Sequence, residues 1–336
     1  MPKTFPYLEV SGTHKDLGTA IGKMFRPQIQ EIIREYRETV PEYQQLLAQV
    51  PPYIASTQNA FPQLVEEAEA IAAAAEVPFL EYFFINNDEV YSPDAEWVGK
   101  NEALADHCTI AVSFNAHGAV VGHNEDWSLA ALKYLYVLKA TVNGTSFLGL
   151  QYGVGLAGVA ATINNWGLVQ CINSLYHTPQ VGVPKNFLAR AVLECKTLDE
   201  AENLIRKTKR ASGFNHVLVQ NHEARNIEIA DNIISVDRVN QGSYVHTNHY
   251  LSPELKSFEK FHTKSSDARY LRATQLAHAD MTKEEMVALL SDTQDSQFPI
   301  CRPDHTVGSL IFIPATRQVW ICYGHPCASE YIKYEI

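Results

Sequence analysis

The periodicity of the apolar residues changes near residue 107, and this change restricts the folds open to the chain. Before it, apolar residues recur every three or four positions, which is the spacing of an amphipathic helix. After it, short apolar runs are separated by turn residues, which is the pattern of β-strands. Because helices and strands form separate groups along the chain, we expect the layers of an α+β fold rather than a strict alternation of strand and helix.

The first third of the chain predicts helices throughout. Thr13 can cap a first helix whose apolar face includes Leu17, and Pro27 is expected to bend or split this helix. Further helices are expected over 61–75 and 79–90, followed by a loop over 92–106.

The remainder predicts mostly strands. They are expected near 108–114, 119–127, 134–142, 146–151, 157–163, 167–172, 215–220, 226–230, 243–246, 307–313 and 317–323. Helices are expected among them over 186–196, 198–210, 266–278 and 282–290. Between the first two strands, Gly118 can supply the positive φ that a tight hairpin turn favours.

Length and charge narrow the class of protein. The chain has 336 residues, enough for one large domain or two ordinary ones, and 46% of them are hydrophobic, enough for a sizeable core. A formal net charge of −11 argues against nucleic acid or an anionic membrane surface as a partner. No apolar run has the length of a membrane span or the form of a signal peptide. We therefore expect a soluble, cytoplasmic protein whose six cysteines are free thiols, with an oxidised pair as the alternative.

Cys108 stands at the junction of the two halves, at the start of a predicted strand and directly after Asp106 and His107. A free cysteine is often a small core side chain. Cleavage of the peptide bond between His107 and Cys108 would instead give Cys108 both a thiol and a free α-amine. This amine, with a pKa of roughly 7.7–8.0, can serve as the base for a thiol nucleophile. Both interpretations stay open on these residues alone.

Four short motifs follow one another along the chain. They are Asp-His-Cys-Thr at 106–109, Asn-Glu-Asp at 124–126, Val-His-Thr-Asn-His at 245–249 and Phe-Pro-Ile-Cys-Arg at 298–302. In this order, at this spacing and behind a helical leader, they make the chain resemble the acyl-CoA:isopenicillin N acyltransferase family, autoproteolytic cysteine members of the N-terminal nucleophile hydrolases. One position departs from the family pattern. The family cysteine usually follows a glycine, which eases strained dihedrals, whereas here it follows His107.

The resemblance implies an α+β fold of four layers, the αββα sandwich of the N-terminal nucleophile hydrolases. Residues 1–107 would form a helical leader that becomes the α-chain after autocleavage, and residues 108–336 would form the β-chain, with one structural domain overall. The implied partners are a small-molecule amide or acyl donor and the leader itself, in an αβ heterodimer, with a higher oligomer left open. No cofactor and no metal are implied.

The resemblance also assigns roles to single residues. Cys108 would be the nucleophile in self-cleavage and then in catalysis. Asp126 would orient the new amine, and Asn248 would donate its amide to the oxyanion. Ser212 matches a family serine linked to processing, and Thr306 stands where the family has another serine. His107 belongs to the processing site because its peptide bond would be cut.

Four polar residues near these motifs each have two interpretations. Arg302 could hold a substrate carboxylate or form a structural ion pair. Asn124 could contact the substrate or close a turn. Arg269 and Arg272 lie one helical turn apart and are expected to be mainly structural.

The sequence gives little indication of metal binding or phosphate binding. On a strand, His246 and His249 would point to opposite faces, and no cysteine or carboxylate lies near them at ligand spacing, so no metal site is expected. The spacing of Cys322 and Cys327 is not that of a zinc knuckle and indicates packing. The chain has no glycine-rich phosphate-binding loop.

The expected activity is that of an autoproteolytic cysteine amidohydrolase or acyltransferase acting on a small N-acyl amine or amino-acid amide through a Cys108 thioester. Hydrolysis is favoured because no basic cluster marks a site for the phosphates of coenzyme A. One alternative is a Cys–His hydrolase without autocleavage, in which an imidazole activates Cys108. Another is a non-catalytic binding module on the same fold, suggested by His107.

Overall fold

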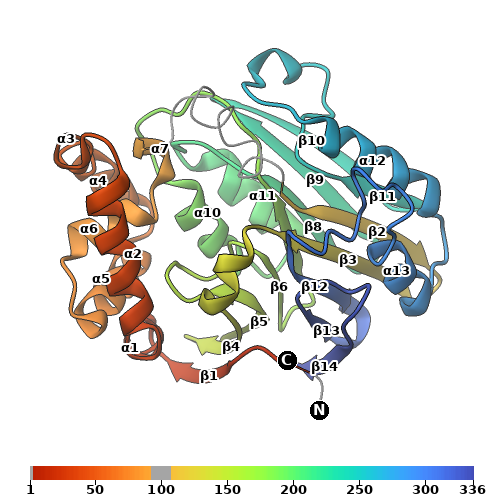
Figure 1. The fold of residues 1–336 in the computed structure, drawn as a ribbon, viewed down its shortest axis with the longest axis horizontal. Helices are drawn as coiled ribbons and strands as arrows, with labels where there is room; N and C mark the ends of the chain where they lie inside the picture. The colour runs from red at the N-terminus through yellow and green to blue at the C-terminus, as the bar shows by residue number, and fades with distance from the viewer. Residues whose placement is uncertain (1–2, 92–106) are drawn as a thin grey trace.

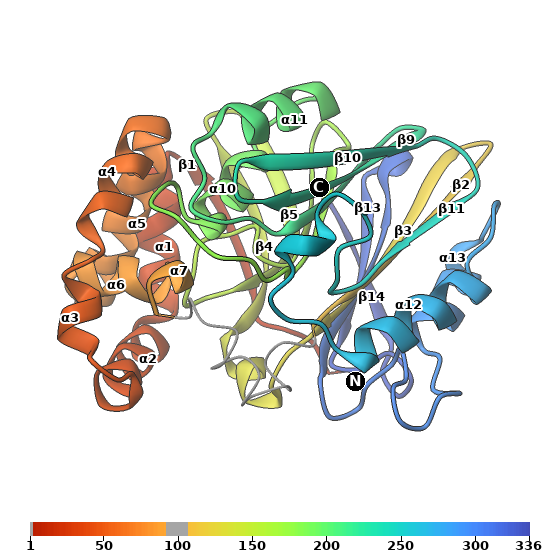
Figure 2. The same ribbon diagram turned by 90° about the horizontal axis from the view of Figure 1, so that it is seen from above.

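Two β-sheets pack face to face, and helices cover the outer face of each sheet (Figure 1). The computed structural model describes residues 3–91 and 107–336. Seen from above, the four layers follow one another across the molecule, with the helices of the first third at one side (Figure 2). This arrangement confirms the predicted αββα sandwich. No helix in the described ranges is both long and apolar enough to cross a membrane.

The larger sheet has eight strands. In spatial order they are β1 (Tyr7–Gly12), β4 (Leu135–Val142), β5 (Thr145–Tyr152), β6 (Ala161–Asn164), β7 (Val169–Asn173), β8 (Asn215–Gln220), β9 (Glu223–Ala230) and β10 (Ile233–Val239). Its neighbouring strands are antiparallel except for β1 and β4, which run parallel.

The smaller sheet has six antiparallel strands, and Cys108 directly precedes the first residue of its strand β2. In spatial order they are β11 (Ser243–His246), β2 (Thr109–Asn115), β3 (Gly118–Asp126), β12 (Thr306–Ile313), β13 (Gln318–Tyr323) and β14 (Tyr331–Glu335). The hairpin between β2 and β3 closes at Gly118, whose φ of +132° confirms the predicted need for glycine there.

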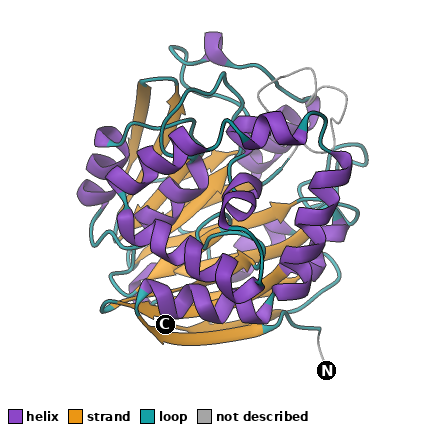
Figure 3. Cartoon of the chain, turned by 90° about the vertical axis from the view of Figure 1, so that its left-hand side faces the viewer, coloured by secondary structure: helices purple, strands orange, loops and turns teal. Residues whose placement is uncertain are grey.

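The helices form the two outer layers. Figure 3 shows helices lying over the strands of the larger sheet. The described helices of this side are α1 (His14–Met24), α2 (Arg26–Thr39), α3 (Tyr43–Leu47), α4 (Pro51–Ala60), α5 (Pro62–Ala75), α6 (Phe79–Ile85), α7 (Asp88–Tyr91), α10 (Lys185–Val192) and α11 (Leu198–Lys207). On the smaller sheet lie α12 (Lys264–Leu276) and α13 (Lys283–Leu290).

The space between the sheets is filled by side chains that alternate inward along the strands. Ile110 and Val112 of β2 pack in one buried cluster with Leu148 and Leu150 of β5. Two fully buried side chains of this size contribute roughly 1.5–3 kcal/mol each to the free energy of folding. This core holds β2 rigidly, and with it the residue at which β2 begins.

The first helix is set by its cap and by its contact with α5. The hydroxyl of Thr13 accepts a hydrogen bond from the backbone of Asp16, whose carboxylate in turn accepts from the backbone of Thr13, forming a capping box. A Cβ at Gly18 would lie 2.3 Å from the backbone oxygen of Glu67, so only glycine allows α1 to approach α5 this closely. The prediction that the helix would be split near Pro27 is confirmed, since α2 begins at Arg26.

The sequence suggested that the first third is helical throughout, but the structure contains a strand there. Residues 7–12 form β1, which adds a parallel strand to the edge of the larger sheet. The sequence analysis missed this strand because its side chains are mostly exposed and no apolar run marks it. It also missed four other elements, α3, α4, β10 and β14.

Several predicted elements differ in their bounds, and two of these differences have a clear local cause. The helix expected over 79–90 is interrupted at Asn86 and Asn87, so that α6 and α7 are separate. The strand expected over 157–163 begins only at Ala161, because turns occupy the residues before it. The loop expected over 92–106 lies outside the described residues.

Candidate active site

Cys108 lies on the wall of a cavity of about 250 Å³ that opens beside the start of β2. The wall is built from both sides of the junction at residue 107. Tyr36 and Tyr91 come from the helices of the first third, whereas Tyr152 and Phe214 come from the larger sheet and the segment before β8. The cavity is therefore lined by aromatic, aliphatic and some polar side chains, with a thiol on its wall and space for a small molecule.

The carbonyl group of Cys108 is held from two directions. It accepts a hydrogen bond of 3.0 Å from Nδ2 of Asn173, at the end of β7, and one of 2.9 Å from Nη1 of Arg269, in α12. Asn173 belongs to the larger sheet and Arg269 to the outer helix layer. Together they fix Cys108 relative to both sheets.

The thiol of Cys108 is poorly suited to ionise by itself. The side chain is buried, and burial, followed by the negative charges of Glu125 and Asp126, raises the pKa of the Cys108 thiol well above its usual value. A nucleophilic role at neutral pH therefore requires a nearby base that removes the proton during the reaction.

Asp126 is positioned by the strand next to β2 and by β12. The register pairs Thr109 with Asn124, so the end of β3 runs beside the start of β2. Oδ1 of Asp126 accepts a hydrogen bond of 2.6 Å from the hydroxyl of Thr306, and Oδ2 lies 3.7 Å from Nη1 of Arg302. Of the two interpretations of Arg302, this contact supports the structural ion pair.

Asn248 is locked by three hydrogen bonds. Its backbone N–H donates to Oγ of Ser266 at 2.8 Å, and its Oδ1 accepts from Nη2 of Arg269 at 3.1 Å. Its Nδ2 donates to the backbone oxygen of Ser174 at 3.3 Å, and Ser174 lines the cavity. Because Arg269 occupies the oxygen, the orientation of the carboxamide is fixed with its N–H groups toward the Ser174 side.

The side chain of His107 is held on the cavity wall by one stacking contact and two polar contacts. Its ring stacks on the indole of Trp127 with the centroids 4.3 Å apart and an angle of 12° between the rings. Its Nε2 lies 3.0 Å from the hydroxyl of Tyr176, and its Nδ1 lies 3.3 Å from the backbone oxygen of Asp126. The residue that replaces the family glycine is therefore held by its own contacts.

Glu125 brings a buried carboxylate to the same cavity. Oε1 accepts a hydrogen bond of 2.7 Å from the hydroxyl of Tyr152, and Oε2 lies 2.8 Å from Nε2 of His123. Ligand atoms of Cys108, His123 and Glu125 lie within 4.8 Å of one another. The cavity therefore has a fixed negative group close to the thiol.

Ser212 lies at another polar cluster near the cavity. Its hydroxyl donates to Oε1 of Glu89 at 2.6 Å, and the backbone N–H of Lys185 donates to the same oxygen at 2.8 Å. Burial, and then the charge of Asp88, raises the pKa of Glu89 to about 7. The ammonium group of Lys185 lies 2.6 Å from Asp88, and both residues line the cavity.

The prediction that Asn124 contacts the substrate is wrong, because its side chain lies away from the cavity. Its Nδ2 donates to the backbone oxygens of Leu290 and Ile300, at 2.9 and 3.1 Å, and its Oδ1 accepts from Ser309 at 2.5 Å. The side chain is fully buried and ties β3 to the α13 layer. The reason is strand alternation, since Glu125 faces the cavity and its neighbour Asn124 faces the other side of the sheet.

The sequence analysis missed several residues that the fold brings to the site. Arg269 is in contact with Cys108 and Asn248, whereas Arg272 forms the expected structural ion pair, 2.7 Å from Asp292. Asn173 belongs to none of the sequence motifs, and only the packing of the two sheets brings it to Cys108. Glu125 had a visible signal: it lies opposite Cys108 in the β2–β3 hairpin, on the same face.

Comparison with known proteins gives one family match. Residues 113–328 match the family model described as acyl-coenzyme A:6-aminopenicillanic acid acyl-transferase. The match begins within β2, five residues after Cys108, and includes Asp126, Asn248 and Thr306.

A curated relative from Drosophila melanogaster, a β-alanyl-dopamine/carcinine hydrolase, is 26% identical to the chain over 220 residues. The alignment covers 60% of this chain and 57% of that hydrolase. Among solved structures, penicillin V acylase from Agrobacterium tumefaciens is similar with a TM-score of 0.46 and 12% identity, over 68% of this chain and 86% of that one. A mutant of the conjugated bile acid hydrolase from Clostridium perfringens gives a TM-score of 0.45 and 10% identity, over 68% of this chain and 97% of that one.

Proposed function

The chain belongs to the acyl-coenzyme A:6-aminopenicillanic acid acyl-transferase family, and from this premise we propose that it is an autoproteolytic cysteine amidohydrolase with Cys108 as its nucleophile. The observation that carries the proposal is the position of Cys108, at the start of a core strand and on the wall of a cavity. Asp126 and Asn248 flank it from neighbouring elements, and both are fixed by hydrogen bonds.

The first proposed step is cleavage between His107 and Cys108. The thiol sulfur attacks the carbonyl carbon of His107, the C–N bond breaks, and the nitrogen takes the thiol proton and becomes a free amine. Water then hydrolyses the resulting thioester, giving a carboxylate on His107 and a free thiol on Cys108. The stacking of His107 on Trp127 supports this step because it restricts the side chain of the residue whose carbonyl is attacked.

In the second proposed step the processed residue acts on a substrate amide. The new α-amine of Cys108 takes the thiol proton, which overcomes the raised thiol pKa, and the sulfur attacks the amide carbonyl. An N–H of Asn248 donates to the oxyanion, and the α-ammonium returns its proton to the leaving amine. Water hydrolyses the thioester to a free acid. Asp126 holds the charge of the α-ammonium.

The proposed substrate is a small amide whose acyl group carries an ammonium, such as a β-alanyl amine. Glu125 supports this class because its carboxylate is buried beside the thiol and can pair with a cation in a site of low dielectric. The aromatic walls suit a ring on the amine side of the substrate. The relative from Drosophila, named for β-alanyl-dopamine and carcinine, has the same substrate class.

One observation favours a second candidate, a Cys–His hydrolase without autocleavage. His123 lies close to Cys108, and its Nε2 is hydrogen-bonded to Glu125 at 2.8 Å, an order of groups that could activate a thiol. In this candidate the chain stays whole and His123 is the base. The two candidates therefore differ in the state of the His107–Cys108 peptide bond.

The proposal is tested by incubating the purified protein with β-alanyl-dopamine and, as a matched control, N-acetyldopamine, with and without a free amine acceptor. We expect β-alanine as the product, a transient acyl adduct on the fragment that begins with Cys108, and slower turnover of the uncharged acyl group. A new amide in the presence of the acceptor would identify a transferase instead. Failure of the cleaved protein to turn over any amide would favour the binding-module alternative.

A further inference from the structure

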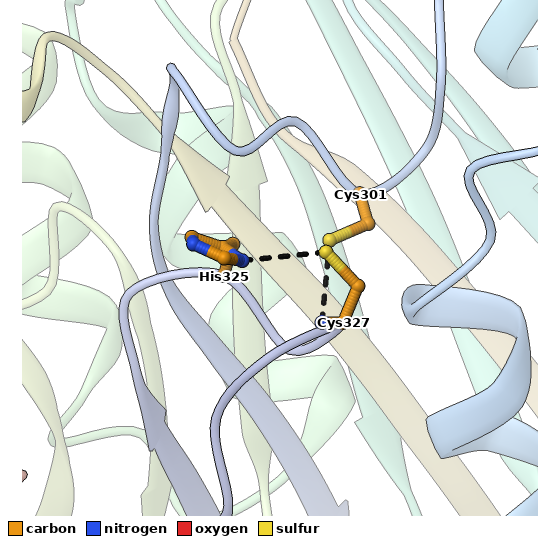
Figure 4. Close-up of side chains that lie close together, drawn as sticks. All are labelled: Cys301, His325 and Cys327. Carbon is orange, nitrogen blue, oxygen red and sulfur yellow. Dashed lines mark hydrogen bonds between the residues drawn. The ribbon is translucent and has the colours of Figure 1, made fainter. Parts of the chain in front are cut away.

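Three side chains outside the cavity of Cys108 lie close together beside the smaller sheet (Figure 4). Cys301 lies in the segment before β12, whereas His325 and Cys327 lie between β13 and β14. The backbone N–H of Cys327 donates to Sγ of Cys301 at 3.3 Å, and Nδ1 of His325 lies 3.3 Å from Sγ of Cys327. The two sulfurs and a ring nitrogen all lie within 4.8 Å of one another.

This spacing is close to what a tetrahedral zinc ion requires. Zinc binds thiolate sulfur at about 2.3 Å and imidazole nitrogen at about 2.0–2.1 Å, which separates its ligand atoms by roughly 3.3–3.8 Å. The ligand types agree as well, because thiolates and imidazole select Zn²⁺ over Mg²⁺ or Ca²⁺. Only small side-chain movements would therefore separate the present cluster from a bound state.

The three residues differ in burial, so an ion bound by them would be enclosed by protein on one side and accessible from solvent on the other. Cys301 is fully buried and His325 is half-buried, whereas Cys327 is exposed. The thiol of Cys322, which the sequence grouped with Cys327, instead faces the backbone oxygen of Tyr323 at 3.8 Å. The spacing along the chain thus hid the cluster, because its inner ligand comes from a separate segment.

We propose that Cys301, His325 and Cys327 form a binding site for a thiophilic divalent cation of the Zn²⁺ type. The two thiols each release one proton, and the two thiolate sulfurs and Nδ1 of His325 bind the ion. Nε2 of His325 then carries the ring proton. Water fills the fourth position at the exposed side of Cys327.

The site lies one short chain of contacts away from Asp126. Cys301 precedes Arg302, whose backbone N–H donates to Oγ1 of Thr306 at 3.0 Å. The same hydroxyl donates to Asp126 at 2.6 Å. An ion that links Cys301 to the segment of Cys327 would therefore steady the loop that holds Thr306.

The test is a Co²⁺ and Zn²⁺ titration of the reduced full-length chain in a Cys108→Ala background, which removes the thiol of the cluster in the cavity. We expect one equivalent of Co²⁺ with thiolate-to-metal absorption, displacement by Zn²⁺, and a rise in Tm with Zn²⁺. Adding Cys301→Ser or His325→Gln should weaken binding by roughly a hundredfold or more. Adding Cys195→Ser, at a buried thiol in another core cluster, should leave it unchanged.

Three outcomes would overturn the proposal. The first is the absence of Zn²⁺ binding at micromolar concentration, and the second is binding that persists in the Cys301→Ser chain. The third is a Cys301–Cys327 disulfide, seen as a peptide mass lower by two hydrogens after purification without reductant, combined with failure of the reduced pair to bind. Because each readout measures binding, none of them depends on the proposed amide hydrolysis.

Discussion

Arg269 joins the proposed nucleophile Cys108 to the predicted oxyanion donor Asn248, because Nη1 of its guanidinium donates to the backbone oxygen of Cys108 while Nη2 donates to Oδ1 of Asn248. The arginine is fully buried in α12 and has a second contact with the hydroxyl of Thr109 at 2.8 Å. The rigid fork of a guanidinium can hold both oxygens at once, which a lysine ammonium on a flexible stem does less well. The geometry therefore predicts that the positions of Cys108 and Asn248 are coupled through the side chain of Arg269.

The first prediction is that Arg269→Lys lowers kcat on the proposed amide by roughly ten- to a hundredfold, with a smaller change in KM. The charge is kept, but the carboxamide of Asn248 loses its fixed orientation, and misplaced groups are costly in catalysis. Arg272→Lys is the matched control, because Arg272 lies one turn further along α12 and pairs with Asp292. Equal losses in the two variants would reduce Arg269 to a structural role.

The second prediction concerns the oxyanion. Asn248→Asp keeps an oxygen for Arg269 but replaces the N–H donor by a carboxylate oxygen, so kcat should fall by about 10²–10³. Circular dichroism should change little, because the new carboxylate pairs with Arg269, whereas Tm should fall because the hydrogen bond from Nδ2 to the backbone oxygen of Ser174 is lost. Turnover close to that of the wild type would remove Asn248 from the proposed mechanism.

The layers and the hairpin could be predicted from the sequence because they depend on local periodicity and on residues close together in the chain. The four motifs could be recognised for the same reason. It failed where pairing decides the outcome. Residues 7–12 form a strand only because β4 lies beside them, and nothing in their composition marks this. Asn173 and Arg269 reach Cys108 from the other sheet and from α12, so no linear motif could identify them. Asn124 lay in a motif, but the face of its strand decides its contacts.

The third prediction is a loss of stability between neutral and alkaline pH that depends on His14. Burial by itself lowers the pKa of His14, but hydrogen bonds to Glu194 and Glu67 outweigh it and raise the pKa to about 9. The ordinary pKa near 6.5 applies to the unfolded chain, so the folded state binds more protons between these values. The contribution, on the order of 3 kcal/mol, is complete below about pH 6.5 and disappears as the pH rises through about 9.

Urea unfolding at pH 6, 7.5 and 9 measures this effect. His14→Gln should have a free energy of unfolding that depends less on pH over this range than that of the wild type. The variant accounts for the other groups that titrate between pH 6 and 9, because they are the same in both chains. Parallel curves for the two proteins would show that His14 has an ordinary pKa in the folded state.

The fourth prediction is that Glu125 selects the acyl group. Glu125→Gln preserves the hydroxyl contact with Tyr152 but removes the negative charge, so kcat/KM for a β-alanyl amide should fall by roughly 10–150-fold, the worth of a hydrogen bond between charged groups. The corresponding propionyl amide lacks the ammonium and should be turned over equally well or better by the variant. An equal loss for both substrates would assign Glu125 to the chemistry of Cys108 rather than to recognition of the cation.

The last prediction concerns the peptide bond between His107 and Cys108. Purified protein should separate in denaturing electrophoresis into fragments of about 12 and 26 kDa, which divide 37.6 kDa in the ratio of 107 to 229 residues. N-terminal sequencing of the larger fragment should begin Cys-Thr-Ile-Ala, and Cys108→Ala should stay whole. His107→Ala retains the nucleophile but loses the stacking on Trp127 and the contact with Tyr176, so cleavage should slow by roughly ten- to a hundredfold. Tyr176→Phe removes only the hydroxyl contact and should have a smaller effect. A wild-type chain that remains intact and still hydrolyses amides would overturn the N-terminal amine as the base and favour His123.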